Sequence, residues 1–299
     1  TNDKKGFDVT LKSAGDFLLY FDSPNTNEIK KLIKAREIWD QFIEGNYKTA
    51  EPGLIFWSTM TKYSPSNYVG KPIVCTNPCA EVPLEDGGAC NLGSINLSRF
   101  VIDGFTTEAS INWDQLAEST ETLVRFLDNV VTWNEDLNAL EKQRVAAAET
   151  RRLGLGVMGI ADMLNQLGVA YDSEQGTAMI EKVMEYITNA AYQASSFIAK
   201  EKSPSTIFNE KSYMECPFVK EALSEQTHNM IKKNGLRNIA IMSIAPTGSI
   251  SNIVLGYKGV DKNYIGVSGG VEPIFSVFYT RRSESFGNNG SVVIVLRDS

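Results

Sequence analysis

Apolar residues recur every three to four positions in several long segments of this chain, and this spacing predicts amphipathic helices. Shorter continuous apolar runs between them predict buried strands. The predicted helices cover 27–44, 114–134, 158–167 and 177–202, the predicted strands cover 72–75, 238–244 and 273–279, and 7–21 predicts a strand leading into a helix. Strands that alternate with long helices indicate parallel α/β layers or an α/β barrel.

The composition is typical of a globular chain without nucleic-acid or membrane segments. The 299 residues are 42% hydrophobic and 22% charged, with a net charge of −7. The acidic balance and the lack of a long basic tract argue against a cationic nucleic-acid-binding face. No apolar run approaches the about 18 residues that a membrane span needs, and the first ten residues lack a signal-peptide pattern. We therefore expect a cytoplasmic protein without a membrane segment.

The cysteines are too sparse for a disulfide scaffold. The chain has four, Cys75, Cys79, Cys90 and Cys216, and its one histidine, His228, leaves too few clustered ligands for a structural zinc site. We therefore expect no metal site. The sequences around the first and last cysteine offer no polar partner at short spacing, so both are predicted to be buried structural thiols. The histidine stands in a polar helical segment and is predicted to be a solvated surface residue.

The segment GLGVMG, residues 154–159, matches the GxGxxG spacing of dinucleotide-binding loops. That motif requires a strand directly before it and a helix that begins within it. Here the preceding residues AAAETRRL predict a helix, and no acidic residue stands at a plausible strand end about twenty residues later. We therefore interpret these glycines as positions of close helix packing.

A run of small residues, APTGSIS at 245–251, follows the predicted strand 238–244. Such a turn lets backbone N–H groups approach an anion, and a helix that begins after it would add its N-terminal dipole. A plain strand-to-helix turn with an N-capping Ser or Thr explains the same residues equally well. The pattern alone leaves both interpretations open.

The segment NPCAE places an amide and a carboxylate two residues from the thiol of Cys79. A nearby carboxylate disfavours a thiolate nucleophile, and a single histidine gives little support to a Cys–His couple. A thiol that stays protonated suits hydrogen-atom transfer, with Asn77 as a hydrogen-bonding group and Glu81 as a base. Cys90, which follows a glycine turn, offers a second thiol that can give electrons by forming a disulfide.

Several segments together resemble the catalytic subunit of ribonucleotide reductases. The segments that carry the resemblance stand in the family's order and read NPCAE, ACNLGSINL, RRLGLGVMGIADML, IAPTGSIS and GGVEPIFSVFYTRR. The likeness is closest to the adenosylcobalamin-dependent class II enzymes, in which the two cysteines of this region are also eleven residues apart and the phosphate loop also reads PTG. It extends from Ile38 to Arg282.

The resemblance implies a fold. Residues 1–282 would form part of the ten-stranded α/β barrel of the family, mainly its second half-barrel, with a finger loop in the centre. Residues 283–299 would form a divergent C-terminal tail.

The resemblance also implies roles for individual residues. Cys79 would form the thiyl radical that takes the 3′-hydrogen of the ribose, Glu81 would accept the proton of the 3′-hydroxyl, and Asn77 would hydrogen-bond the substrate hydroxyls. Cys90 would be one of the two thiols that reduce the substrate. The implied substrate-binding residues are Asn77, Pro78, Cys79, Ala80, Glu81, Pro246, Thr247, Gly248, Ser249 and Ile250.

Finally, the resemblance implies partners. The substrate would be a ribonucleoside di- or triphosphate, the radical source adenosylcobalamin or alternatively a dimetal-containing partner subunit, and the electron donor a thioredoxin-type reductant. In the family the partner thiol of Cys90 lies well upstream of the finger, where this chain has 78 residues before Cys79. We therefore expect a companion chain that carries the N-terminal half, in a homo- or hetero-oligomer.

A second hypothesis is a non-catalytic, nucleotide-binding remnant or an assembly partner of such an enzyme. A decayed copy need not keep Asn77, Cys79, Glu81 and Cys90 together, so their presence favours the enzyme.

Overall fold

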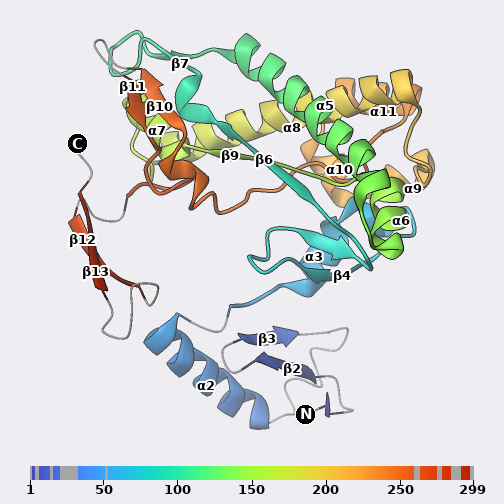
Figure 1. The fold of residues 1–299 in the computed structure, drawn as a ribbon, viewed down its shortest axis with the longest axis horizontal. Coiled ribbons are helices and arrows are strands. Elements are labelled where there is room, and N and C mark those ends of the chain that lie inside the picture. Colours follow the sequence, from blue (N-terminus) through green and yellow to red (C-terminus); the bar gives the residue numbers. More distant parts are fainter. Residues whose placement is uncertain are drawn as a thin grey trace.

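The computed structural model describes residues 2–3, 7–13, 16–20, 33–50, 53–258, 263–274, 278–283 and 291–296 (Figure 1). The strands are β1 (Asn2–Asp3), β2 (Phe7–Ser13), β3 (Asp16–Tyr20), β4 (Ile73–Thr76), β5 (Pro83–Glu85), β6 (Asn91–Asn96), β7 (Val101–Ile102), β8 (Ser110–Ile111), β9 (Leu153–Met158), β10 (Leu255–Lys258), β11 (Asn263–Ile265), β12 (Phe278–Ser283) and β13 (Ser291–Leu296). The helices are α2 (Ile33–Thr49), α3 (Trp57–Tyr63), α4 (Pro65–Tyr68), α5 (Trp113–Leu137), α6 (Glu141–Thr150), α7 (Ile160–Gln166), α8 (Glu174–Lys202), α9 (Glu210–Tyr213), α10 (Pro217–Ala222) and α11 (Glu225–Asn234), with short 3₁₀ turns η1 (Leu97–Arg99) and η2 (Ile250–Asn252).

A parallel layer lies at the centre of the described chain. Strand β6 pairs in parallel with β9 along its whole length. Residues 239–243 run parallel to the other edge of β9, where the Leu155 N–H donates to the Ile241 carbonyl and the Ser243 N–H donates to the Leu155 carbonyl, both at 2.8 Å. Helix α5 packs on β6 and β9, and α8 lies beside α5 (Figure 1). The β–α–β order therefore builds an α/β layer, as the hydrophobic pattern predicts.

The local sequence explains these elements. Helix α5 begins where the side chain of Asn112 accepts a hydrogen bond from the Gln115 N–H, and α8 begins where Ser173 caps Gly176 in the same way. Strand β9 is buried along its full length, and its uninterrupted small and apolar sequence is typical of a parallel strand covered on both faces. Among the described residues, no helix combines the length and apolar character needed to cross a membrane.

The hydrophobic core fills the space between the parallel layer and the helices. Most of its fully buried members come from β9, α5, α7, α8 and α11, and each buried Val, Leu or Ile side chain contributes roughly 1.5–3 kcal/mol by leaving water. Representative core residues are Leu116, Val124, Leu155, Val157, Leu164, Ile187, Ile198 and Ile231. This core holds β9 in place, and the candidate site is built on β9.

Most predicted long elements are confirmed. The helices predicted at 114–134 and 177–202 are α5 and α8, and the strand predicted at 72–75 is β4. The segment predicted as a strand at 238–244 is hydrogen-bonded to β9 but forms only an isolated parallel bridge, Leu155 to Met242, and is not a full strand. Helix α2 begins at Ile33, and the predicted residues 27–32 lie outside the described part.

Other predictions at the chain ends need adjustment. The strand predicted at 273–279 is found only from Phe278, where β12 begins, and 275–277 lie outside the described residues. Strand β12 crosses the predicted boundary after residue 282 and pairs antiparallel with β13.

Two predictions are wrong in type. Residues 16–20 form β3, antiparallel to β2, where a helix was expected; the alternation of apolar Phe7, Val9 and Leu11 already has the two-residue period of a hairpin strand. The residues GLGVMG, 154–159, form strand β9 from its second residue onward and the glycine that follows it, where close helix packing was expected. The preceding helix α6 was predicted, but Arg151 with a φ of 46° ends it, so a strand begins directly after it.

Candidate active site

The segment NPCAE forms the tip of a hairpin. Strands β4 and β5 pair antiparallel, so this part of the predicted loop is regular structure. Asn77 closes the tip: its carbonyl accepts a hydrogen bond from the Ala80 N–H at 3.0 Å, and its Oδ1 accepts one from the Val82 N–H at 3.0 Å. Ala80 has a left-handed backbone with a φ of 64°. The tight turn leaves the side chain of Cys79 exposed.

A buried ion pair fixes the base of this hairpin. The carboxylate of Glu85 at the end of β5 accepts hydrogen bonds from Arg152 Nη2 at 2.6 Å and Nε at 3.1 Å. Its other oxygen accepts a hydrogen bond from the Thr150 hydroxyl at 2.8 Å. Both charged side chains are buried and satisfied, so the pair ties the hairpin firmly to the start of β9.

The glycines of GLGVMG form one bare face on β9. Gly154 and Gly156 are two residues apart, so they point to the same side of the strand. A Cβ on Gly154 would lie 2.7 Å from Cys90 Sγ, and one on Gly156 would overlap the backbone carbonyl oxygen of Ser243. The absence of side chains therefore admits the Cys90 thiol and the 243 backbone against the same strand.

Ser243 links this face of β9 to the tip of the β4–β5 hairpin. Its hydroxyl donates a hydrogen bond to the backbone carbonyl of Glu81 at 3.0 Å. The Glu81 Oε2 atom is buried, and among the described residues it has no hydrogen-bond partner. Three residues after Ser243 the chain enters the PTG turn at Pro246. The structure thus brings Glu81, Cys90 and the segment that leads into this turn together, with Cys79 at the exposed tip.

The environment of Cys90 keeps its thiol protonated. Burial is the largest cause that raises the pKa of Cys90; Arg152 lowers this pKa, the charges of Glu85 and Glu81 raise it, and together these effects bring it to about 11. All four cysteines are free thiols. A neutral thiol of this kind can give a hydrogen atom, or a proton and electrons, but is a poor ionic nucleophile.

We expect the alkylation rate of Cys90 to report this pKa. In the folded chain the rate should rise about tenfold per pH unit and level off only near pH 11, and at pH 8 it should be about 100-fold below that of an ordinary accessible thiol. Iodoacetamide labelling read by peptide mass spectrometry measures it, with the urea-unfolded chain as control. A plateau near pH 8.5 in the folded chain, about the ordinary thiol value, would contradict this environment.

The PTG turn presents its backbone to solvent. Gly248, Ser249 and Ile250 are exposed, and within the described part of the chain the N–H groups of Gly248 and Ser249 have no hydrogen-bond acceptor. The following helix η2 has only three residues and lacks a side-chain N-cap. The turn therefore fits the anion-binding interpretation better than the N-capping one, although the expected helix dipole is missing.

Two cysteines and the histidine were predicted to be structural or surface residues, and the structure shows the surroundings of each. Cys216 is fully buried as predicted, with its thiol 3.6 Å from the Tyr63 carbonyl. Cys75 is only half-buried. His228 is half-buried, and its Nε2 lies 2.7 Å from the Val219 carbonyl, so the prediction of a solvated side chain is wrong.

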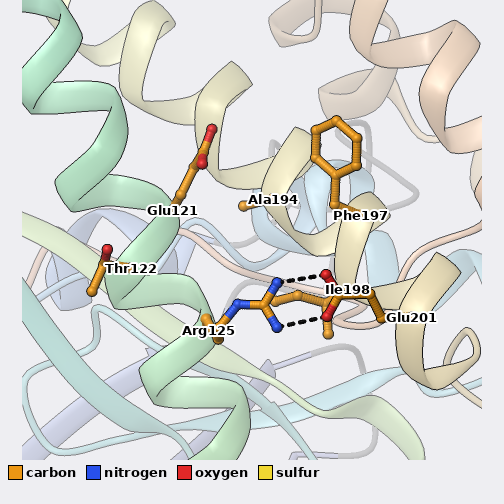
Figure 2. A pocket seen from close by; sticks show the side chains of 7 residues that line it. All are labelled: Glu121, Thr122, Arg125, Ala194, Phe197, Ile198 and Glu201. Carbon is orange, nitrogen blue, oxygen red and sulfur yellow. Dashed lines mark hydrogen bonds and ion pairs between the residues drawn. The ribbon is translucent and has the colours of Figure 1, made fainter.

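A separate pocket of about 310 Å³ lies between α5 and α8 (Figure 2). Arg125 and Glu201 face each other across it and form two hydrogen bonds of 2.7 and 2.9 Å. Its described lining residues are Glu121, Thr122, Arg125, Ala194, Phe197, Ile198 and Glu201. None of them is a predicted site residue, so this pocket is distinct from the candidate active site.

Sequence reasoning missed the residues that hold the site together, namely Ser243, Glu85, Arg152 and the two glycines of β9. The glycines carried a usable signal, because two glycines at a spacing of two within an apolar strand mark a close backbone approach. The ion pair joins positions 67 residues apart, and no local pattern reveals it.

Comparison with known proteins identifies the family of the chain. The sequence pattern of the ribonucleotide reductase barrel domain matches residues 17–298. The chain is 37% identical over 283 residues to the vitamin B12-dependent ribonucleoside-diphosphate reductase of Thermoplasma acidophilum, covering 92% of this chain and 32% of that protein. It is 34% identical to the enzyme of the same name from Mycobacterium tuberculosis strain CDC 1551, covering 87% of this chain and 32% of that protein.

A solved structure supports the fold. The class Id ribonucleotide reductase alpha subunit of Actinobacillus ureae aligns with a TM-score of 0.54 and 24% identity, over 73% of this chain and 37% of that one. The chain belongs to the ribonucleotide reductase barrel-domain family. It spans about a third of the length of the vitamin B12-dependent relatives.

Proposed function

We propose that this chain carries the thiyl-radical centre of a ribonucleoside-diphosphate reductase, active in the cytoplasm together with a companion chain that supplies the upstream half. One observation carries the proposal. Cys90 and the chain that leads into the PTG turn both lie against β9, that chain is hydrogen-bonded to Glu81 through Ser243, and Cys79 is exposed at the tip of the same hairpin. The diphosphate substrate is favoured by the names of the two vitamin B12-dependent relatives.

Each residue has a chemical role in this proposal. Cys79 exchanges a hydrogen atom with the 3′-position of the ribose, and its exposed side chain can reach a substrate. The unpartnered Oε2 of Glu81 accepts the proton of the 3′-hydroxyl. Asn77 has its Oδ1 engaged by Val82, so its side-chain N–H group donates to a substrate hydroxyl.

Reduction at the 2′-position requires two electrons and two protons. Cys90 and a second thiol supply them: the C–O bond breaks, water leaves, a C–H bond forms, and the two sulfur atoms join in a disulfide. The neutral state of Cys90 suits this role because the thiol still holds its proton. The second thiol comes from the companion chain, and a thioredoxin-type reductant restores both thiols afterwards.

The turn formed by Pro246, Thr247, Gly248, Ser249 and Ile250 binds the substrate diphosphate. Its unpaired backbone N–H groups and the exposed Ser249 provide donors to phosphate oxygens. Pro78 and Ala80, at the tip of the β4–β5 hairpin, line the substrate site.

The radical source in this proposal is adenosylcobalamin, because the two relatives are named vitamin B12-dependent. When bound, that cofactor supplies the organic radical chemistry that amino-acid side chains lack. The exposed thiol of Cys79 fits this use, since an accessible S–H group is what a radical source must reach. His228, the one histidine of the chain, is bonded to the Val219 carbonyl on the helical side and does not fit the role of a cobalt ligand.

This chain offers surfaces on which the companion chain can dock. Within the described residues, β6 pairs only with β9, so its outer edge is open and Leu92 there is 47% exposed. Helix α5 also exposes the apolar side chains of Phe126, Trp133 and Leu137. These features favour a hetero- or homo-oligomer.

The test is reconstitution with a ribonucleoside diphosphate, a thioredoxin-type reductant and a companion chain carrying the upstream half. We expect deoxyribonucleotide to form when adenosylcobalamin is added and not when it is omitted. Product only with a dimetal-containing subunit would move the radical source to that partner. Substrate binding without product in both arms would contradict catalysis and support the nucleotide-binding remnant.

A further inference from the structure

The PTG turn rests on a second segment, residues 266–271, which we call the backing segment. The N–H of Gly266 donates to the Val254 carbonyl at 2.6 Å, and the N–H of Val267 donates to the Ser251 carbonyl at 2.8 Å. The backing segment therefore holds the chain immediately after the turn.

Gly270 fits directly under the turn. Its φ is 92°, and a Cβ at this position would lie 2.5 Å from the hydroxyl oxygen of Thr247 and 2.9 Å from the carbonyl oxygen of Pro246. Thr247 is itself buried, with a left-handed φ of 56°. The shape of the turn is thus matched to a bare backbone at Gly270, and any shift of the backing segment moves the turn.

The opposite side of the backing segment is clamped to α7. The carbonyl of Gly270 accepts a hydrogen bond from the Gly159 N–H at 2.6 Å. The carboxylate of Asp162 accepts the Ser268 N–H at 2.9 and 3.1 Å and the Ser268 hydroxyl at 3.0 Å. Asp162 lies in the first turn of α7, so a charged acceptor engages both donors of one serine.

Helix α7 continues directly from β9. The same strand carries Gly154, against which the Cys90 thiol lies. One continuous piece of chain, 153–166, therefore sets the position of the reducing thiol at one end and of the PTG turn at the other. In catalysis an error of about 1 Å between such points costs about 100-fold in rate.

We infer that Asp162 is a positioning residue for the diphosphate of the substrate, acting through Ser268 and Gly270 on the PTG turn without touching the ligand. The inference rests on the proposed function of that turn. Asp162 holds the backing segment, the backing segment holds Thr247, and the turn then presents its N–H groups in one fixed arrangement.

The test measures binding of inorganic pyrophosphate to the full 299-residue chain, followed by NMR shifts of the Gly248 and Ser249 amides. We expect Asp162→Ala to weaken binding at least about tenfold, because a charge-assisted clamp is lost. Asp162→Asn should stay within about threefold of the wild type, since its amide oxygen still accepts the serine N–H. The matched control is Glu174→Ala, an exposed acid in the first turn of α8, which should change nothing.

Each outcome decides a different point. If the wild type binds pyrophosphate at other amides or not at all, the proposed phosphate turn fails and this inference with it. If the wild type binds at the turn and Asp162→Ala binds equally well, only this inference is overturned. If Asp162→Ala does not fold, Ser268→Ala replaces it and should weaken binding while leaving the Cys90 alkylation rate at pH 8 unchanged; equal binding there overturns the inference.

Discussion

Cys79→Ser is expected to abolish deoxyribonucleotide formation in the reconstituted pair, by at least about 10⁴-fold, as the loss of an essential reacting group does. An alcohol O–H bond is much harder to break homolytically than a thiol S–H bond, so serine cannot carry the radical. The side chain of Cys79 is exposed, so the fold should be unaffected. Product formation and substrate affinity are measured side by side, and only the first should fall.

Cys75→Ser is the matched control for that variant. Cys75 is a half-buried thiol on β4 of the same hairpin, four positions from Cys79. We expect this variant to keep its activity within a few-fold of the wild type. Equal losses for the two serine variants would show that the hairpin is merely sensitive to substitution. Turnover by Cys79→Ser would remove that cysteine from the mechanism.

Asp128→Ala is expected to lower the free energy of unfolding by about 3–5 kcal/mol, the cost of breaking a buried ion pair by removing one partner. Asp128 is fully buried in α5 and accepts hydrogen bonds from Arg151 Nε at 2.8 Å and from the Asn238 side chain at 3.0 Å. Arg237 Nε lies 3.6 Å from the same carboxylate. Without the Asp128 carboxylate, the buried Arg151 guanidinium would lose its buried counter-charge and keep only the partly exposed Glu135, 2.8 Å away. Urea unfolding followed by circular dichroism measures the change.

The same helix offers the control. Arg125 on α5 pairs with Glu201 on α8, and both side chains are about half exposed. Glu201→Ala should therefore leave the urea unfolding midpoint nearly unchanged, because exposed ion pairs are weak. If both variants lose the same stability, burial is not what makes the Asp128 network important.

The residues of the candidate site at the hairpin tip could be recognised in the sequence because they are local. Asn77, Cys79 and Glu81 stand within five residues, and a single hairpin tip holds them. The PTG turn is a local run of small residues, so an accessible backbone there could also be expected from the sequence. The long helices α5 and α8 were predictable for the same reason, since each has a clear apolar period and a capping residue.

The rest depends on contacts between distant parts of the chain. The Ser243 hydroxyl meets the Glu81 carbonyl across 162 positions, and Asp162 meets Ser268 across 106. Residues GLGVMG were interpreted as part of a helix contact because their use becomes visible only when Cys90 and the 243 backbone lie against β9. Local propensity could not decide this, because tertiary packing overrides it.

The central claim is that the two thiols have different tasks, with Cys79 as the radical and Cys90 as the reductant. A single-turnover reaction tests it most directly. The reduced chain and its companion are mixed with a ribonucleoside diphosphate and adenosylcobalamin without external reductant, and every cysteine is then alkylated and identified by mass spectrometry. Because only free thiols are alkylated, we expect about one deoxyribonucleotide per active site, with Cys90 left unlabelled in a disulfide and Cys79 labelled as a free thiol. Product formation that leaves Cys90 free, or that oxidises Cys79 in its place, would contradict the account.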